Sequence, residues 1–455
     1  MHIILSYKSR NIMRRYYGLL FLLTGCAVQT PAVKVQDVRF DADRQPLKEG
    51  IAAYDKMDYI YQKDGKDIFK ISFGEPTVVA VADEPYKWGF FQFPGLYTSD
   101  DGEIVARWNM ADDHAESYGK GGNGFAVSKD GGKTWEHPAK QPIGGGLALK
   151  SGEFLNIHTP AAIPLKDLKL PEPIATVKEA YGRTFKFWKT EDLPMELQGV
   201  YLLRRTKESS TWTIEHNTIL EPDMVRYSDN NLLPVVWWGD MKLKTDGTIV
   251  AGVYPGFTFQ NGAVPPSDVP FYGSQDHGKT WQFIGRIPYS YDPVKDPKGG
   301  QRHALGYTEP TFEILKDGTY VCVSRTTDGL GNSPMYISRS MDEGKNWTKP
   351  VAFTKNGVLP KLRQLDNGAL VLASGRPGMQ IRVALDKVGD TWSDPFEMLP
   401  WVEGVHENHI SCSYPEILFT GKDKFLLIYS DFRYKTESGE LRKAIKVREV
   451  SVKLL

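Results

Sequence analysis

The 455-residue sequence contains only three cysteines, Cys26, Cys322 and Cys412. Cys322 and Cys412 lie in apolar or mixed stretches that read as strands, which favours buried free thiols over a disulfide framework. No spacing of Cys and His resembles a zinc site, and a fold of this size is stable without such staples. We therefore expect no metal and no cofactor, although the sequence leaves a structural calcium site open.

The chain also lacks an excess of charge of either sign. It carries 56 Lys and Arg against 56 Asp and Glu and is formally neutral. A nucleic-acid-binding protein usually presents a basic face. We therefore expect no nucleic acid partner.

The apolar run near the N-terminus, Tyr16–Leu23, is too short to span a bilayer. It follows Arg14 and Arg15 and ends in Leu-Thr-Gly-Cys at Cys26, which resembles a bacterial lipoprotein signal. This pattern predicts a signal peptide over residues 1–25, lipidation of Cys26 and a polar tether over 26–50. The expected location is the bacterial cell envelope, with the membrane contacted through the lipid anchor. A secretory or uncleaved signal is the alternative.

Helical periodicity is nearly absent, and the chain instead repeats one turn motif, S-x-D-x-G-x-T-W. In this motif, known as the Asp-box, Asp accepts hydrogen bonds from the turn backbone, Gly permits a positive φ, and Trp buries its ring. The motif therefore closes a hairpin and is structural. Three good copies and one degenerate copy occur at Ser128–Trp135, Ser274–Trp281, Ser340–Trp347 and Asp386–Trp392.

A second repeat is an apolar strand, a tight turn containing Gly, and another apolar strand. Six such hairpins predict an all-β, six-bladed β-propeller over residues 51–455. The last strand, Ala444–Leu455, is expected to pair near Ile68–Val81 and close the ring. The six hairpins span Leu96–Ala106, Leu147–Ile157, Met241–Val253, Phe312–Val323, Leu362–Ala373 and Ile417–Tyr429.

The starts of the inner strands are expected to face one mouth of the propeller. Proline recurs at the same distance before the turn in four hairpins, so the preceding residue should stand at the same height in each. The third hairpin has no such proline and contributes Trp238. An acid, a phenol and apolar side chains therefore converge on one pocket: Phe93, Trp238, Glu309, Leu359 and Tyr414.

Over about residues 70–455 the chain resembles the sialidase (neuraminidase) superfamily of glycoside hydrolases. That family uses a tyrosine nucleophile, a glutamate that takes its proton, and an aspartate acid/base. A neutral phenol attacks an anomeric carbon beside a carboxylate without charge repulsion. The resemblance implies Tyr414 as nucleophile and Glu309 as its base, with Asp112 or Asp113 as acid/base.

The same resemblance implies three arginines that bind the substrate carboxylate, because guanidinium binds it bidentately. Arg325 matches the second arginine, and Arg382 matches the third, with Arg376 competing for that role. The first arginine belongs to a Phe-Arg-Ile-Pro motif, but this chain has Gln92 in its place. Losing one charged arm costs about 1.5–3 kcal/mol, on the scale of one charged hydrogen bond. Lys87 and Arg107 are candidates to compensate.

Three histidines, His303, His406 and His409, lie in segments that feed the same mouth. Paired with Tyr414, they suggest a different reaction, proton abstraction next to a uronate carboxylate. The leading prediction is a sialidase-like exo-glycoside hydrolase acting on acidic glycans. A lyase or dehydratase on uronate-containing oligosaccharides is the alternative, and a non-catalytic glycan-binding propeller is the third reading.

Overall fold

A computed structural model describes most of the chain after residue 49. The described residues all belong to the second of two compact units, residues 39–455. The predicted signal 1–25, Cys26, the tether up to residue 49, Cys412 and His406 lie outside the described residues. The described ranges are 50–84, 87–113, 115–178, 183–326, 334–376, 378–400, 402, 405, 409–411 and 414–455.

The described part is all-β, as predicted, and contains no α-helix. No helix in that part has the length and apolarity needed to cross a bilayer. Its only helices are short 3-10 turns: η1 (Ala115–Ser117), η2 (Leu165–Asp167), η3 (Thr190–Asp192), η4 (Met195–Leu197) and η5 (Gly299–Gln301).

All six predicted hairpins form antiparallel pairs. The pairs are β5 (Gln92–Thr98) with β6 (Ile104–Asn109), β8 (Leu147–Ala148) with β9 (Glu153–Ile157), β17 (Trp238–Leu243) with β18 (Ile249–Tyr254), β21 (Tyr307–Ile314) with β22 (Tyr320–Thr326), β25 (Val358–Gln364) with β26 (Leu370–Gly375), and β29 (Glu416–Gly421) with β30 (Lys424–Lys435).

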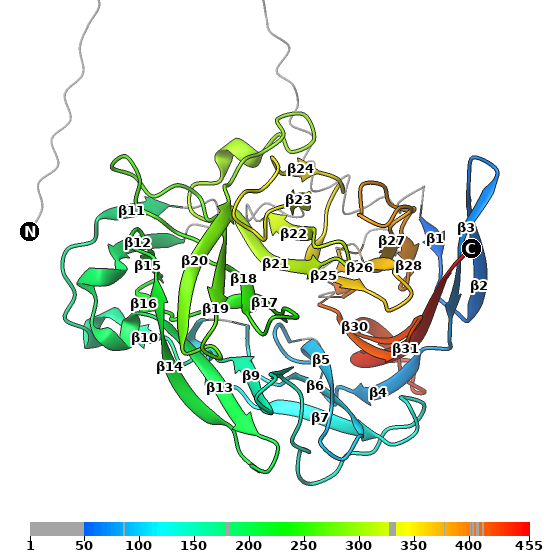
Figure 1. The fold of residues 1–455 in the computed structure, drawn as a ribbon. Helices are drawn as coiled ribbons and strands as arrows, with labels where there is room; N and C mark the ends of the chain where they lie inside the picture. Colours follow the sequence, from blue (N-terminus) through cyan, green and yellow to red (C-terminus); the bar gives the residue numbers. More distant parts are fainter. Residues whose placement is uncertain are drawn as a thin grey trace, which may run out of the picture. The chain divides into compact units, whose positions relative to one another are not determined.

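Further strands extend these hairpins (Figure 1). They are β7 (Asn123–Ser128) on β6, β13 (Val200–Thr206) and β14 (Thr213–Leu220) beyond β9, β19 (Val269–Ser274) and β20 (Thr280–Ile287) beyond β18, β23 (Tyr336–Ser340) and β24 (Val351–Ala352) beyond β22, and β27 (Met379–Val383), β28 (Phe396–Glu397) and β1 (Ile51–Ala52) beyond β26.

The predicted pairing of the two ends of the sheet region is confirmed. The last strand, β31 (Leu441–Leu454), pairs with β30 and also with β3 (Lys66–Phe73) and β4 (Thr77–Val81). β2 (Met57–Lys63) adds to the far edge of β3. In Figure 1 the red β31 lies beside the blue β3 and β4, so strands from opposite ends of the chain share one sheet.

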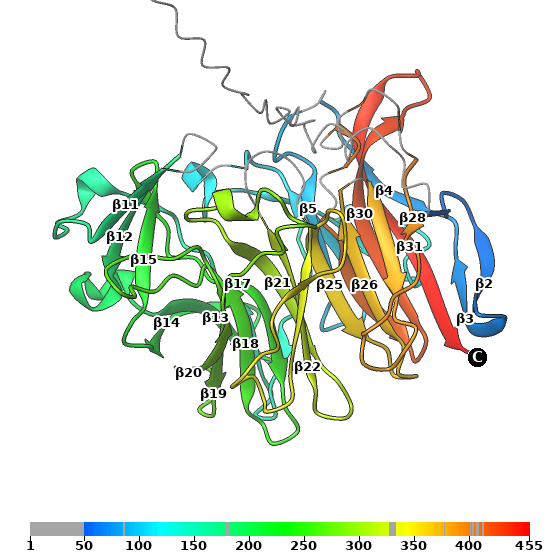
Figure 2. The same ribbon diagram turned by 90° about the horizontal axis from the view of Figure 1, so that it is seen from above.

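One sheet is absent from the sequence prediction. In the sequence, three of its five strands precede β13 and β14 and two follow them. In Figure 2 the sheet lies next to β14 and β13. Phe185 and Phe187 of this inserted sheet pack against Phe257 and Val264, so it has an apolar core of its own. The strands are β10 (Ile163–Pro164), β11 (Ala175–Lys178), β12 (Thr184–Lys189), β15 (Val225–Asp229) and β16 (Leu232–Leu233).

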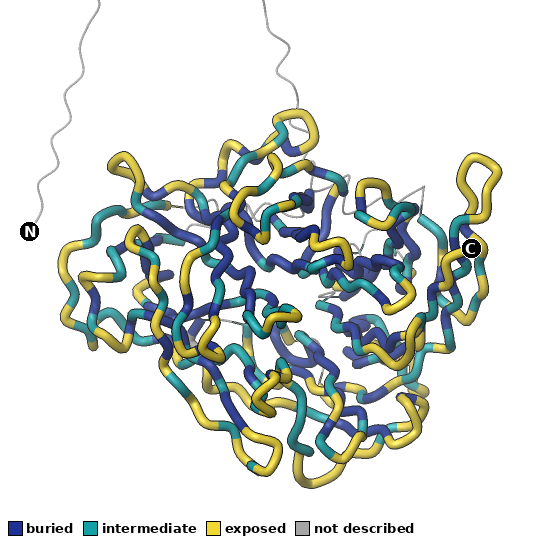
Figure 3. The backbone as a smooth tube through the Cα atoms, in the orientation of Figure 1, coloured by how far each residue is buried: buried dark blue, intermediate teal, exposed yellow. Residues whose placement is uncertain are grey.

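The first strands of the hairpins touch one another in sequence. β8 contacts β17, β17 contacts β21, β21 contacts β25, β25 contacts β29, and β29 contacts β5. A bridge between Ser99 and Gly144 joins the first hairpin to the segment before β8. Among these strands, β21 and β25 consist of buried and intermediate residues, and Figure 3 shows exposed residues mainly at the turns and outer loops.

The repeated turn motif has the hydrogen bonds expected of it. Asp130 Oδ1 accepts from the Thr134 backbone N–H at 2.9 Å, and the Trp135 indole donates to the Gly132 carbonyl at 3.2 Å. The equivalent bonds recur in the other copies, including the degenerate one at Asp386. These turns therefore fix the hairpins and take no part in the site described below.

Candidate active site

Three of the five residues predicted to stand at one height share an unusual backbone conformation. Phe93, Glu309 and Leu359 have φ of 50°, 47° and 33°, and the ladder register shifts at each. The proline that follows each of them cannot donate a ladder hydrogen bond, which explains a bulge at this point. These three inner strands therefore begin with the same kink.

Glu309, Arg325 and Tyr414 form one hydrogen-bonded cluster. The Tyr414 hydroxyl donates to Glu309 Oε1 at 2.9 Å, and Arg325 Nη1 donates to the same oxygen at 2.8 Å. Arg325 Nη1 also lies 3.3 Å from the Tyr414 oxygen. The second carboxylate oxygen, Oε2, accepts the Leu359 backbone N–H at 3.0 Å. Residues from β21, β22 and the approach to β29 thus meet at one carboxylate.

The electrostatics of this cluster keep the phenol neutral. Burial, and then the negative charge of Glu309, raise the pKa of Tyr414 well above its usual value. The positive charges of Arg325 and Arg376 oppose that shift. A neutral hydroxyl that already donates to a carboxylate can pass its proton along that hydrogen bond when it attacks an electrophile.

The structure distinguishes the two candidates for the third arginine. Arg376 has φ of 48° and is 8% exposed, and its charge acts on Tyr414. Its buried Nε has no hydrogen-bond partner among the described residues, although this atom does not by itself distinguish Arg376 from Arg382. Arg382 lies on β27, where Nη1 donates to the Ser393 carbonyl at 3.2 Å. The described contacts therefore bring Arg376 to the cluster, and they place Arg382 against the outer strands.

The two candidate acids face different surroundings. Asp113 Oδ2 accepts the Trp88 indole N–H at 3.0 Å, and the Asp113 charge acts on Tyr414. Asp112 instead pairs with Lys87 at 3.5 Å, and both side chains are about half exposed (49% and 51%). The ring of Trp88 also lies 5.8 Å from the Arg376 guanidinium carbon. Trp88, which the sequence did not single out, links Asp113 to Arg376.

Gln92 is fully buried where the resemblance expects an arginine. Its Oε1 accepts the Gly89 backbone N–H, and its Nε2 has no partner among the described residues. Neither candidate for compensation reaches it by a described bond: Lys87 is paired with Asp112, and Arg107 is an exposed residue near Tyr97. The charge of a first arginine is therefore not restored by these two residues.

Aromatic side chains border the cluster on two sides. The Phe93 ring meets that of Tyr414 edge to face, with centroids 4.7 Å apart. Trp238 packs against Tyr118 and Tyr254 at 5.3 Å each, and these contacts lead into the core of the inserted sheet. Tyr254 was missed from the sequence, although it is the ladder partner of Trp238 across the hairpin.

Two of the three predicted histidines belong to the described residues. His303 and His409 are both exposed. His406 lies outside those residues. No group of three or more His, Cys, Asp or Glu side chains in the described part is arranged to hold a metal ion.

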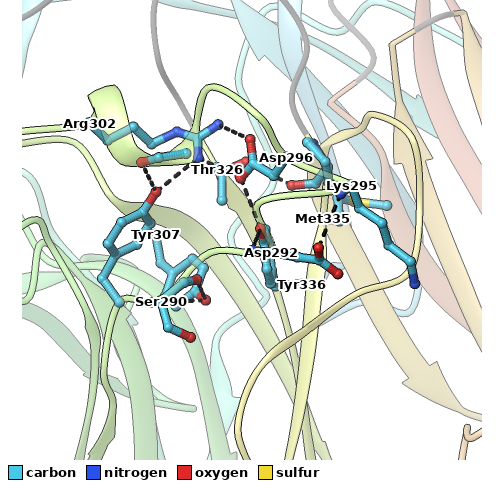
Figure 4. Close-up of polar contacts among 12 residues, drawn as sticks. Ser290, Asp292, Lys295, Asp296, Arg302, Tyr307, Thr326, Met335 and Tyr336 are labelled. Carbon is cyan, nitrogen blue, oxygen red and sulfur yellow. Dashed lines mark hydrogen bonds and ion pairs between the residues drawn. The ribbon is translucent and has the colours of Figure 1, made fainter.

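The residue before His303 belongs to a second cluster, which Figure 4 shows. Arg302 donates to both oxygens of Asp296, at 2.6 and 3.1 Å, and the Tyr336 hydroxyl donates to Asp296 Oδ2 at 2.9 Å. The Arg302 side chain is 0% exposed and that of Asp296 is 2% exposed. This cluster fixes the segment that leads into β21, and hence to Glu309.

Comparisons with known proteins give the fold and no closer relationship. No family model and no curated protein matches the chain. A protein of unknown function from Dyadobacter fermentans is similar in structure, with a TM-score of 0.55, 20% identity, and coverage of 84% of this chain and 99% of that one. Structural neighbours also include sialidases at low identity.

Two of these sialidases illustrate the level of similarity. The Hadza microbial sialidase Hz136 matches at a TM-score of 0.43 and 16% identity, over 80% of this chain and 65% of its own. The NanB sialidase of Streptococcus pneumoniae matches at 0.43 and 15%, over 82% of this chain and 70% of its own. The chain thus spans about two thirds of the length of these proteins.

Proposed function

We propose that residues 51–455 form a six-bladed β-propeller that hydrolyses acidic glycans from the end, as the sialidase superfamily does. Support for six blades comes from the six inner hairpins, from the successive contacts among their first strands, from the Ser99–Gly144 bridge, and from the pairing of β31 with β3 and β4. The inserted sheet is then an addition to the second blade, since it is interleaved with β13 and β14.

The observation that carries the proposed chemistry is that Glu309 Oε1 accepts from both Tyr414 and Arg325. In the first step the Tyr414 oxygen bonds to the anomeric carbon while its proton passes to Glu309. The glycosidic bond breaks, and Asp113 protonates the leaving oxygen. In the second step Asp113 takes a proton from the attacking water, and the released phenolate regains its proton from Glu309. The anomeric configuration is retained.

The substrate carboxylate is proposed to bind Arg325 and Arg376, with Gln92 donating through Nε2. Among the described residues, Arg376 (8% exposed) has no partner at Nε and the fully buried Gln92 has none at Nε2. Such buried donors are costly unless another group completes their hydrogen bonds. The acidic group of the substrate would supply acceptors for both.

Gln92 also favours a second candidate, a lyase or dehydratase on uronate-containing oligosaccharides. There an amide and arginines would neutralise the uronate carboxylate, a histidine would take the adjacent proton, and the neutral Tyr414 hydroxyl would protonate the leaving oxygen. A glycan-binding propeller without activity is the third possibility, and the unfilled hydrogen bonds at Arg376 and Gln92 fit it equally well.

One experiment separates the three. The purified protein is incubated with a fluorogenic sialoside, with aryl uronides and with uronate oligosaccharides. Hydrolase activity releases the fluorophore or the aryl group, and lyase activity produces the ultraviolet absorbance of an unsaturated uronate. Glycan binding by calorimetry without either product would identify a binding protein and overturn the enzymatic proposal.

We also propose that the chain is anchored to the bacterial cell envelope by a lipid on Cys26. The support is the Leu-Thr-Gly-Cys pattern after the apolar run Tyr16–Leu23. Metabolic labelling with a fatty-acid analogue should mark the wild type and leave Cys26→Ser unlabelled. Equal labelling of both would refute the anchor.

A further inference from the structure

The inner strands carry a buried ionic network close to the Glu309–Tyr414 pair. Its members lie two to four residues along the strands from the positions at the mouth. Asp240 is on β17, Thr311 on β21, Lys361 and Arg363 on β25, and Glu416 on β29. The contacts described next join their side chains across these neighbouring inner strands.

Asp240 is the centre of this network on the β21 side. The Thr311 hydroxyl donates to Asp240 Oδ2 at 2.6 Å, and the Leu362 backbone N–H donates to the same hydroxyl at 3.1 Å. Arg363 Nη1 donates to Asp240 Oδ2 at 3.1 Å. Thr311 lies two residues from Glu309, so these bonds hold the strand that presents the carboxylate.

Arg363 and Lys361 continue the network to the strand of the phenol. Arg363 Nη2 lies 3.5 Å from Glu416 Oε1, and Lys361 Nζ lies 3.2 Å from Glu416 Oε2. Glu416 is two residues from Tyr414. A continuous set of bonds therefore runs from the neighbour of Glu309, through Asp240 and Arg363, to the neighbour of Tyr414.

The charges of this network balance, with two carboxylates, Asp240 and Glu416, against Lys361 and Arg363. Burial would raise the pKa of Asp240, but Arg363 and Lys361 outweigh it and hold that pKa below its usual value. Asp240 is 8% exposed. Removing one charge from such a group leaves its partner buried and unpaired, which shifts the strands that carry them.

We propose that Asp240 is a positioning residue, which keeps Tyr414 within hydrogen-bond reach of Glu309 by fixing β21 against β29 through Thr311, Arg363 and Glu416. The catalytic consequence rests on the proposed function, whereas the geometric one does not. Misplacing a reacting group by about 1 Å can cost on the order of 100-fold in rate.

In the test, 3-fluorotyrosine replaces Tyr414 in the full-length chain, and its fluorine resonance and the pKa of its phenol are measured. The variants are Asp240→Asn and the milder Thr311→Val, which removes one hydroxyl and keeps every charge. The matched control is Asp431→Asn. Asp431 is also a buried carboxylate of an inner hairpin, on β30, and pairs with Lys446 at 2.6 Å; no hydrogen bond or ion pair among the described residues joins it to Asp240 or Glu416.

We expect Asp240→Asn and Thr311→Val to shift the resonance and lower the phenol pKa toward that of free tyrosine, and Asp431→Asn to change neither. Where a substrate is turned over, kcat should fall about 10-fold or more in the first two variants while KM stays within about 2-fold. If folded Asp240→Asn and Thr311→Val proteins keep the wild-type resonance and pKa, the proposal is wrong, whether or not the protein is an enzyme. Equal shifts in the Asp431→Asn control would refute it as well.

Discussion

Two clusters of this protein contain the same three chemical groups, a carboxylate, an arginine and a tyrosine, and differ in exposure and in the pattern of their hydrogen bonds. In the Asp296–Arg302–Tyr336 cluster, Arg302 donates to both carboxylate oxygens and the ion pair is almost fully buried (0% and 2% exposed). In the Glu309–Arg325–Tyr414 cluster, Nη1 of Arg325 contacts both Glu309 and Tyr414, and the two charged side chains are 11–13% exposed.

The difference shows that composition does not identify an active site. The first cluster is closed and suits a structural role, because its charges satisfy one another. The second is more exposed and combines a proton acceptor, a neutral phenol and a nearby arginine, Arg376, whose Nε has no partner among the described residues. The following predictions compare the two clusters, test whether Arg376 belongs to the second, and end with a carboxylate outside both.

The largest effect is expected from removing the proton acceptor of the second cluster. Glu309→Gln should lower kcat about 10²- to 10⁴-fold, because an amide cannot take the proton of Tyr414. Asp296→Asn, assayed at a temperature where it is folded, should keep kcat near the wild-type value. Steady-state kinetics on the substrate found for the wild type measures kcat for both variants. Equal losses of kcat would show that the two clusters do not differ in catalytic role.

The converse effect concerns stability. Arg302→Met should reduce the free energy of unfolding by about 3–5 kcal/mol, because it leaves the Asp296 carboxylate buried and unpaired. Arg325→Met should cost less than half of that, since Glu309 keeps some contact with water and the Tyr414 hydrogen bond. Urea unfolding of both variants measures this, and the comparison fails if Arg325→Met is the more damaging.

A third pair of variants tests whether Arg376 belongs to the second cluster. Arg376→Gln should raise KM for an acidic glycan about 10- to 100-fold, on the scale of one charged hydrogen bond. Arg382→Gln should change KM less than about 2-fold, because Arg382 is bonded to Ser393. A larger rise for Arg382→Gln would return the role of third arginine to Arg382.

The smallest effect concerns a fully bonded carboxylate at the surface. Hydrogen bonds from Asn346 and Ser340 lower the pKa of Asp342 from 3.8 to about 2. A lowered pKa contributes stability above pH 3.8 that disappears as the pH falls toward 2. Asp342→Asn should therefore have a slightly lower urea midpoint than the wild type at pH 6 and the same midpoint near pH 2. A constant difference across this range would show that the carboxylate charge is irrelevant to the turn.

The hairpins and the pair at the centre of the site could be predicted from the sequence because their signals are local. Each hairpin has its own Gly turn, and the residue before a shared proline locates Glu309 on β21 and Tyr414 just before β29, two inner strands that both contact β25. The same reasoning finds β31 beside β3, because closing the ring of sheets requires the two ends to meet.

The parts that escaped prediction depend on long-range contacts. In the inserted sheet, β12 pairs with β15 about 40 positions away, across two strands of another sheet, so no local turn marks it. The position of Arg376 near Tyr414 involves a left-handed backbone at Arg376 and a contact with Trp88, and no repeated sequence pattern marks either feature. The hydrogen bond between Trp88 and Asp113 likewise becomes visible only in the folded structure.

The most direct test of the account compares two Tyr-to-Phe variants that each delete one hydroxyl bonded to a carboxylate. Tyr414→Phe and Tyr336→Phe are assayed beside the wild type on the sialosides and uronate substrates described above. The account predicts product from the wild type and from Tyr336→Phe, and none from Tyr414→Phe. Turnover by Tyr414→Phe at the wild-type rate would contradict it.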